Sequence, residues 1–376
     1  MAGRVVITGV GLVTPLGRSL SEVSHRVRRR ESAASAPPFA TSVLSCPLCA
    51  SVTDFDAEHY FPENKTLRLM NRDAKLAVVA ARLAMQDAGI AAGETYAAEQ
   101  IALYGATGLT SLSIEEVRPL VRLAAGQDGS LDLGRFGGVA LKRIRPVLSF
   151  KILANMPICF VSILEGIRGP NAVYTPWEGQ GAQAIAAGIR AVRRGEVPCA
   201  LVGACDVKTE LLSFVSLHQL GALTSWSRHG QGCIPGEGAA FLVLEDERQA
   251  ARRGARTLAR VGDYAVRSSG WGMSRKDAFA AVLSGLAGVD RPAVISAADG
   301  DPCLTEDEQN AMREAGVRPS GVLHPKSYLG NLFAAAAAVQ VALGAALVAT
   351  EPHAPSALAN CLGFGTQHAA FLLEAP

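Results

Sequence analysis

Residues 169 to 185 constrain the fold of this chain more than any other stretch. An extended run from Ala172 to Thr175 meets a sharp turn at 176–179, and an alanine-rich helical pattern follows from Ala182 to Arg194. This order predicts a strand, an elbow and a helix. Such an elbow presents one side chain at a helix N-terminus, where unpaired backbone N–H groups and the helix dipole favour an anion. A nucleophile usually occupies that position, but here the tip carries Glu178.

Length and composition limit the possible fold and function. With 376 residues the chain exceeds the size at which one hydrophobic core stops growing, so two packed units are expected. The apolar content is 49% and the charged content 19%, so much of the surface should be buried. A net charge of +2 does not fit a nucleic-acid binder or a strongly basic membrane binder. The apolar run 332–349 is mostly alanine and contains Gln340 and Gly344, which predicts a buried helix and not a membrane span.

The eight cysteines are scattered, mostly in apolar surroundings, which predicts free thiols in a reducing cytoplasm. Cys46 and Cys49 form a lone C-x-x-C without a second pair or a histidine at ligand spacing, so no metal site is expected. No cofactor is expected either, because the glycine pattern at 9–14 lacks a third glycine and no helix opens directly after it. Residues 4–9 predict a strand and not a signal peptide.

Several stretches carry the motifs of one enzyme family. They are the opening run Val-Val-Ile-Thr-Gly-Val-Gly at 5–11, the Gly-Pro-Asn at 169–171 ahead of the elbow, and the Gly-Glu-Gly-Ala at 236–239. With these motifs the chain resembles the β-ketoacyl synthases of the thiolase-like superfamily, over essentially residues 3–374. The resemblance implies an α/β, thiolase-like fold, in which two related βαβαβ-type halves form a layered α-β-α-β-α architecture.

The order of the elements agrees with two halves. Apolar residues recur at helical spacing from Arg72 to Gly89, and a buried strand is expected at 199–206. A second β/α series follows, with its first strand signal at 261–266. Together with the resemblance, this places an N-terminal half carrying the elbow at 1–250 and a C-terminal half at 251–376.

The catalytic residues of the family are replaced. Ketosynthases use an elbow cysteine and two histidines that stabilise the thioester carbonyl. Aligned from either flank of the elbow, the cysteine position falls on Glu178, while Asp299 and Asn331 occupy the two histidine positions. A carboxylate has the wrong charge to face an enolate, and an amide donates a hydrogen bond but is no general acid. No catalytic residue is therefore expected, and a buried Glu178 would need a partner or a proton.

This loss resembles the chain-length factors, or ketosynthase β subunits, of type II polyketide synthases. The resemblance implies a subunit that is not an enzyme on its own and that forms a heterodimer with a catalytic ketosynthase. It would shape the acyl tunnel and so set the length of a polyketide or polyene during decarboxylative condensation on an acyl carrier protein. The growing acyl chain would lie in this tunnel.

The resemblance also implies two groups of contact residues. Substrate tunnel and partner interface are assigned to Leu109, Leu148, Phe150, Met156, Cys159, Trp177 and Phe364. A weaker prediction places carrier-protein contacts on Lys65, Arg68 and Arg72, because basic side chains steer acidic carrier proteins. For the second group, a solvated helix face is the alternative.

Two other functions stay open from the sequence. One is a divergent active condensing enzyme or malonyl decarboxylase in which Glu178 has a new role. The other is a non-enzymatic homodimeric binding protein without a ketosynthase partner. Incubation with malonyl-carrier protein distinguishes the first, and the assembly state after purification distinguishes the second.

Overall fold

The structure is a computed structural model. It describes residues 3–42, 44–109, 112–144, 146–270, 272–286, 291–351 and 353–376. In the segment 107–113, residues 110 and 111 lie outside the described part.

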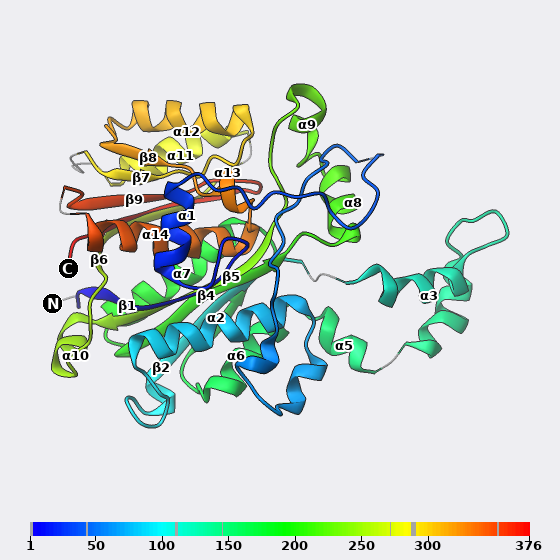
Figure 1. The fold of residues 1–376 in the computed structure, drawn as a ribbon, viewed down its shortest axis with the longest axis horizontal. Helices are drawn as coiled ribbons and strands as arrows, with labels where there is room; N and C mark the ends of the chain where they lie inside the picture. The colour runs from blue at the N-terminus through cyan, green and yellow to red at the C-terminus, as the bar shows by residue number, and fades with distance from the viewer. Residues whose placement is uncertain are drawn as a thin grey trace.

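A mixed β-sheet forms the frame of the described part (Figure 1). Its strand order is β3-β2-β4-β5-β1-β6-β10-β9-β7-β8. The strands are β1 (Val5–Val13), β2 (Ile101–Thr107), β3 (Asn171–Tyr174), β4 (Cys199–Val207), β5 (Glu237–Asp246), β6 (Ala259–Ser268), β7 (Ala293–Ile295), β8 (Gly321–Leu323), β9 (Ser356–Cys361) and β10 (Gln367–Glu374). The first and last five strands meet where β1 pairs with β6 in antiparallel fashion.

The two halves of the sheet repeat one topology. In the first, β2 is parallel to β3 and β4, β4 is antiparallel to β5, and β5 is antiparallel to β1. In the second, β7 is parallel to β8 and β9, β9 is antiparallel to β10, and β10 is antiparallel to β6. Strand for strand, the second five repeat the first, and the predicted pair of related halves is confirmed. The exact boundary after residue 250 stays a prediction; this position lies in α10 (Glu247–Arg252).

Helices complete the layers. Between the halves, α7 (Gly179–Arg193) packs on β2 and β4, and α14 (Ala336–Thr350) packs on β9 and against α7. On the outer faces, α2 (Arg72–Ala88) covers β1 and β5, while α11 (Arg275–Ser284) covers β6 and β10 beside α12 (Pro302–Glu314). This is the predicted layered α-β-α-β-α arrangement (Figure 1). The other helices of the body are α1 (Leu20–Arg28), α8 (Leu211–Gln219), α9 (Thr224–His229), α13 (Lys326–Leu329) and the short 3-10 turn η2 (Lys65–Leu69).

Local sequence explains where the main helices begin and end. The Asn71 side chain accepts a hydrogen bond from the Ala74 N–H, and Gly89 ends α2 in the left-handed conformation, as the predicted stop required. Among the described residues, one helix, Phe333–Thr350, is long and apolar enough to cross a membrane, but 83% of that window is buried inside the protein. It is the central core helix that the sequence predicted.

Between β2 and β3 the chain leaves the body as an arm, which we define as residues 112–155 (Figure 1). It carries α3 (Ile114–Ala124), α4 (Leu133–Arg135) and α5 (Val147–Ile152), and α6 (Met156–Glu165) leads back to the body. Eleven of the fourteen exposed large hydrophobic side chains in the described part lie in and next to the arm: Leu109, Val121, Leu131, Leu133, Val139, Leu141, Val147, Phe150, Ile152, Leu153 and Ile163. Such a concentration marks a contact surface.

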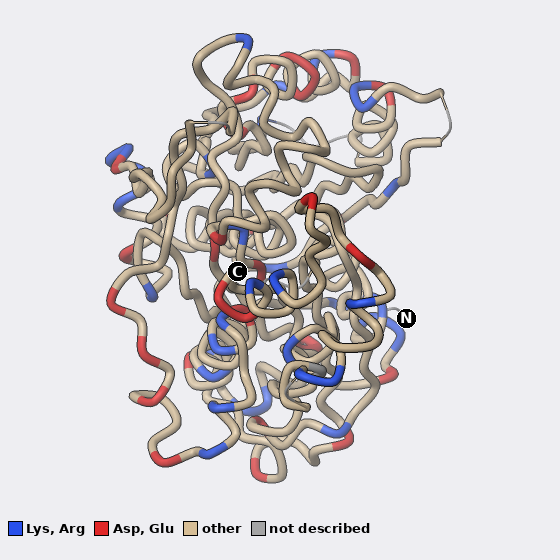
Figure 2. Tube along the Cα trace, turned by 90° about the vertical axis from the view of Figure 1, so that its right-hand side faces the viewer, with Lys and Arg blue, Asp and Glu red and all other residues tan. Residues whose placement is uncertain are grey.

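The charges of the molecule do not gather on this side. Figure 2 looks at the side from which the arm projects, and lysine, arginine, aspartate and glutamate are interspersed along the chain there. This agrees with the small net charge of +2. The arm is therefore distinguished by its exposed apolar side chains and not by an excess of positive or negative charge.

Candidate functional site

The predicted elbow is present and tightly packed. β3 ends at Tyr174, and Glu178 lies directly before α7, which begins at Gly179 instead of the expected Ala182. The first residues of α7 approach the second half of the molecule closely. A Cβ atom at Gly179 would lie 2.6 Å from the Gln367 Cβ and the Gln367 backbone oxygen. The small residues after the elbow are thus required by this contact.

The carboxylate of Glu178 is buried in an ion pair. Glu178 is 5% exposed and Lys326, the first residue of α13, is 3% exposed. The Lys326 Nζ donates hydrogen bonds to Glu178 Oε1 and, at 3.2 Å, to the Leu362 carbonyl oxygen. The other carboxylate oxygen, Oε2, accepts from the Phe364 N–H at 2.8 Å. The elbow of the first half is therefore tied to two segments of the second half.

The pKa values of the pair are set by burial and by each other. Burial raises the pKa of Glu178 above its ordinary value, and the positive charge of Lys326 opposes this shift. Burial acts to lower the pKa of Lys326, but the charges of Glu178 and Asp299 outweigh it, so that this pKa is raised. Lys326 is thus held in its charged form, and the partner that Glu178 required is present.

The two residues at the histidine positions are bonded to each other. The Asn331 Nδ2 donates to the Asp299 Oδ2 at 3.2 Å. The remaining oxygens accept backbone N–H groups: Asn331 Oδ1 from Phe333 at 2.9 Å and Asp299 Oδ1 from Asp301 at 3.1 Å. Both side chains are buried, and the charge of Asp299 also acts on Glu178. The fold therefore brings together all three replaced positions.

Two thiols, Cys233 and Cys361, lie beside this cluster, and neither is activated, because burial raises the pKa of both. Burial raises the pKa of Cys233 well above its ordinary value, and the nearby charges of Asp299 and Glu178 raise it further. The attacking species in thioester chemistry is the thiolate. Cys233 is therefore no substitute for the missing elbow cysteine.

Little space remains at the elbow. The void lined by Glu178, Lys326 and Gly363 leaves no volume that a water molecule can occupy. Trp177 and Phe364 lie beside it, with ring centroids 5.3 Å apart and planes at 69°. An acyl thioester cannot reach Glu178 in this arrangement.

The other predicted tunnel residues lie away from the elbow. Leu109 and Phe150 are 53% and 46% exposed, and Leu148 is half-buried at the edge of a cavity of about 640 Å³ that also contacts Arg68. Met156 and Cys159, at the start of α6, are half-buried. The structure thus places Trp177 and Phe364 at the elbow and the other five at or near the arm. Within this chain alone these residues do not close off the end of a tunnel.

The three basic residues have different surroundings. Lys65 and Arg68 in η2 are exposed, with no ion pair in the described part of the chain. Arg72 instead binds the buried carboxylate of Glu237 through two nitrogens at 2.6 Å each and the Val52 carbonyl at 2.7 Å. Arg72 therefore holds the Gly-Glu-Gly strand in place. Two of its three guanidinium nitrogens are already bonded within the protein.

The structure also contains a pair that the sequence did not reveal. The Ser269 Oγ and the His368 Nε2 are 2.9 Å apart, across 99 residues of chain. The other ring nitrogen, Nδ1, is buried without a partner in the described part, and burial lowers the pKa of His368 to about 4. Among the described residues no carboxylate orients this imidazole as in a catalytic triad, so the pair does not support hydrolysis. No short-range pattern could have found it.

A second buried polar cluster should make the stability of the protein depend on pH. Asp73, at the start of α2, lies near the Asp206–Lys208 ion pair, and burial raises its pKa from 3.8 to about 7. The folded state then holds this proton more tightly than the unfolded state. The stabilisation is complete below pH 3.8 and is lost as the pH rises through 7. We expect Asp73→Asn, which keeps the acceptor for the Ala74 N–H, to remove this loss.

The measurement is the melting temperature of both proteins between pH 5 and 8.5. The melting temperature of the variant should rise relative to that of the native protein as the pH rises. If the two melting temperatures change with pH in parallel, the raised pKa of Asp73 is contradicted.

Residues 2–250 match the family model of the N-terminal domain of β-ketoacyl synthases. The tetracenomycin polyketide synthase ketoacyl synthase β subunit of Streptomyces glaucescens is 27% identical over 90% of this chain and 84% of the relative. The 3-oxoacyl-[acyl-carrier-protein] synthase 2 of Synechocystis is 26% identical over 70% of this chain, and the match spans 62% of that relative's length.

A solved structure agrees with the fold. The ishigamide ketosynthase/chain length factor superposes with a TM-score of 0.81 over the full length of both chains, at 23% identity. The fold is thus that of the thiolase-like ketosynthases, and these relatives include both a synthase and a β subunit.

Proposed function

The chain belongs to the β-ketoacyl synthase family, and we propose that it acts there as a non-catalytic chain-length factor. One observation carries the proposal: at the position of the nucleophile, a buried Glu178 is paired with Lys326 and accepts a hydrogen bond from the Phe364 N–H. In an acyl-transferring relative, a helix N-terminus of this kind would stabilise a developing oxyanion. Here the Glu178 carboxylate makes no hydrogen bond to the first turn of α7 and instead binds Lys326 and the Phe364 N–H.

The partner in this proposal is a catalytic ketosynthase. The arm supplies the contact surface, because its exposed apolar side chains gain most from burial against another chain. The partner's cysteine would perform the condensation, and the acyl chain would extend toward Leu109, Leu148 and Phe150. The acyl carrier protein would dock near Lys65 and Arg68, which are exposed, more than at Arg72, which already holds Glu237. We place the complex in the cytoplasm.

The proposed lack of catalysis has a direct test. When the purified chain is incubated with radiolabelled malonyl- or acyl-carrier protein, we expect no covalent label and no release of carbon dioxide, because thiolate and imidazoles are absent. Glu178→Cys should also remain inactive, since Asp299 and Asn331 still occupy the histidine positions.

The partner ketosynthase, labelled in parallel, is the positive control. Covalent label on the native chain, or decarboxylation by it, would favour the divergent enzyme.

The proposed assembly is tested on the arm. Co-expression with the ketosynthase should give a 1:1 complex, while the chain alone should form homodimers or aggregate. Phe150→Asp with Leu153→Asp places two charges in the interface, and we expect the dissociation constant to rise by about 100-fold or more. Val322→Asp is the matched control, because Val322 is 45% exposed but lies on β8 in the other half.

Light scattering after size exclusion gives the stoichiometry. A native chain that stays a homodimer in the presence of ketosynthases would favour the binding-protein alternative.

A further inference from the structure

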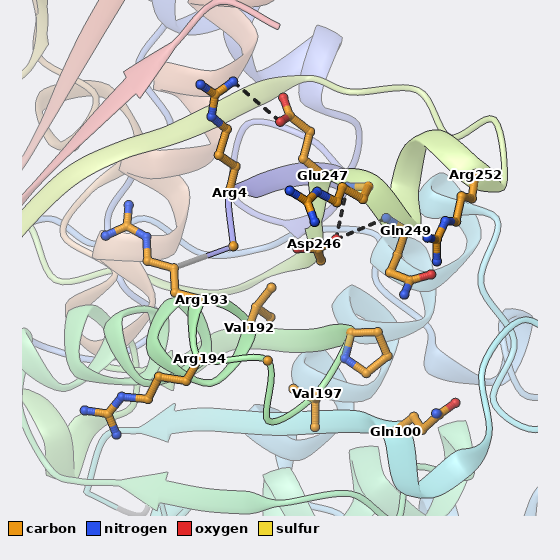
Figure 3. Close-up of a pocket in the computed structure, with 14 residues that line it drawn as sticks. Arg4, Gln100, Val192, Arg193, Arg194, Val197, Asp246, Glu247, Gln249 and Arg252 are labelled. Carbon is orange, nitrogen blue, oxygen red and sulfur yellow. Dashed lines mark hydrogen bonds and ion pairs between the residues drawn. The ribbon is translucent and has the colours of Figure 1, made fainter. Parts of the chain in front are cut away.

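A second cavity lies at the opposite end of α7 from Glu178. It has a volume of about 700 Å³ and forms where the N-terminal residues, the last turn of α7 and α10 meet (Figure 3). Volumes of this size are typical of small-molecule sites. In Figure 1 the N-terminus and α10 lie on the side of the body away from the arm. The cavity would thus stay open when the arm is covered.

Arginine dominates the lining of this cavity. Five arginines surround it, namely Arg4, Arg193, Arg194, Arg248 and Arg252, against the two carboxylates Asp246 and Glu247. Figure 3 shows that the labelled arginines come from three separate elements and surround the hollow without meeting at one point. A ligand with several negative charges fits such a rim better than a single small ion.

Both carboxylates already have partners. Asp246 accepts the backbone N–H groups of Arg248 at 3.0 Å and Gln249 at 3.2 Å. Glu247 pairs with Arg260 at 2.7 Å and more loosely with Arg4 at 3.8 Å. The charge of Glu247 is therefore balanced mainly by Arg260, which lies outside the lining. Asp246 keeps its negative charge, but the arginines of the lining outnumber the two carboxylates.

Two arginines are available for a ligand. Arg193 donates to the carbonyl oxygens of Val261 and Gly262, and Arg194 pairs with Glu196 at 3.7 Å. Arg248 and Arg252 are exposed and have no ion pair in the part of the chain that the structure describes. They lie four residues apart on one short helix, α10.

We propose that this cavity binds a phosphorylated small molecule of about nucleotide size, recognised through its phosphate groups by Arg248 and Arg252. Guanidinium groups match phosphate oxygens in pairs of parallel hydrogen bonds, and this pairing is stronger than that of neutral donors. The site is independent of the elbow and of the partner, so it stands or falls separately from the chain-length function.

The test is calorimetric titration of the full chain, in its purified assembly, at low salt with ADP, pyrophosphate and adenosine. We expect ADP and pyrophosphate to bind and adenosine not to bind. Tighter binding of ADP identifies a nucleotide as the source of the phosphates, and tighter binding of pyrophosphate identifies an inorganic polyphosphate. Arg248→Ala with Arg252→Ala should weaken both by about tenfold or more.

The matched control removes the same charge elsewhere. Arg30 and Arg318 are exposed and have no ion pair among the described residues, so Arg30→Ala with Arg318→Ala should leave both affinities within about twofold. The proposal is overturned if neither phosphate compound binds, if adenosine binds as well as ADP, or if both double variants lose affinity equally.

Discussion

Replacing Lys326 by methionine should lower the free energy of unfolding by about 3–5 kcal/mol, because it leaves the carboxylate of Glu178 buried without its counter-charge. The methionine fills a similar volume, so the loss comes from the charge and not from a cavity. The Phe364 N–H still donates to Glu178, but one neutral donor does not replace an ammonium group. Urea unfolding followed by circular dichroism measures the change.

Two further variants separate the ion pair from other effects. Glu178→Gln combined with Lys326→Met removes both charges, and we expect it to recover most of the lost stability. Arg28→Met breaks the pair with Glu351, in which the side chains are 37% and 43% exposed, and should cost less than about 1 kcal/mol. If Lys326→Met is no more harmful than Arg28→Met, the buried pair does not hold the elbow.

Trimming Phe150 or Leu109 to alanine should lengthen the product by one or more two-carbon units. In the proposed complex these side chains lie where the acyl terminus stops, and a smaller side chain removes the collision that ends elongation. Both side chains are about half exposed in this chain, so each replacement should lower the free energy of unfolding by less than about 1 kcal/mol. The same replacement of a fully buried side chain would cost about 2–5 kcal/mol. Mass spectrometry of the carrier-bound product measures the length.

The control for this effect is Leu220→Ala. Leu220 is 50% exposed, which is close to the exposure of Leu109 and Phe150. It follows α8 and does not belong to the arm. Its replacement should change neither product length nor the rate at which the partner ketosynthase is acylated. A fixed product length with a general fall in activity, in the Phe150 or Leu109 variants, would remove the proposed mechanism of length control.

The repeated sheet topology explains why this scaffold can lose its chemistry and still fold. Each half places its own helix, α7 or α14, between the two halves of the sheet, and the core is formed by the contact of these helices with strands of both halves. The catalytic positions lie at the ends of elements, outside this apolar layer. Their replacement therefore costs little as long as the new polar groups find partners.

The sequence by itself determined the features that depend on neighbouring residues. The strand, elbow and helix at 169–185, the end of α2 at Gly89 and the burial of the alanine-rich helix follow from spacing and local propensity. The absence of a cysteine at the elbow and of histidines at Asp299 and Asn331 is equally visible in the sequence. The family resemblance rested on these motifs and on Gly-Glu-Gly.

Only the tertiary structure decided how the replaced groups are satisfied. Glu178 and Lys326 are 148 residues apart, and their pairing exists only because the two halves pack together. Arg72 and Glu237 are 165 residues apart within the first half, and their pairing exists because α2 packs on β5. The same holds for the exposure of Phe150 and Leu109, which depends on how the arm leaves the body. Local patterns fix a residue's conformation, whereas the partner of a buried charge is chosen by whatever the fold brings within hydrogen-bond distance.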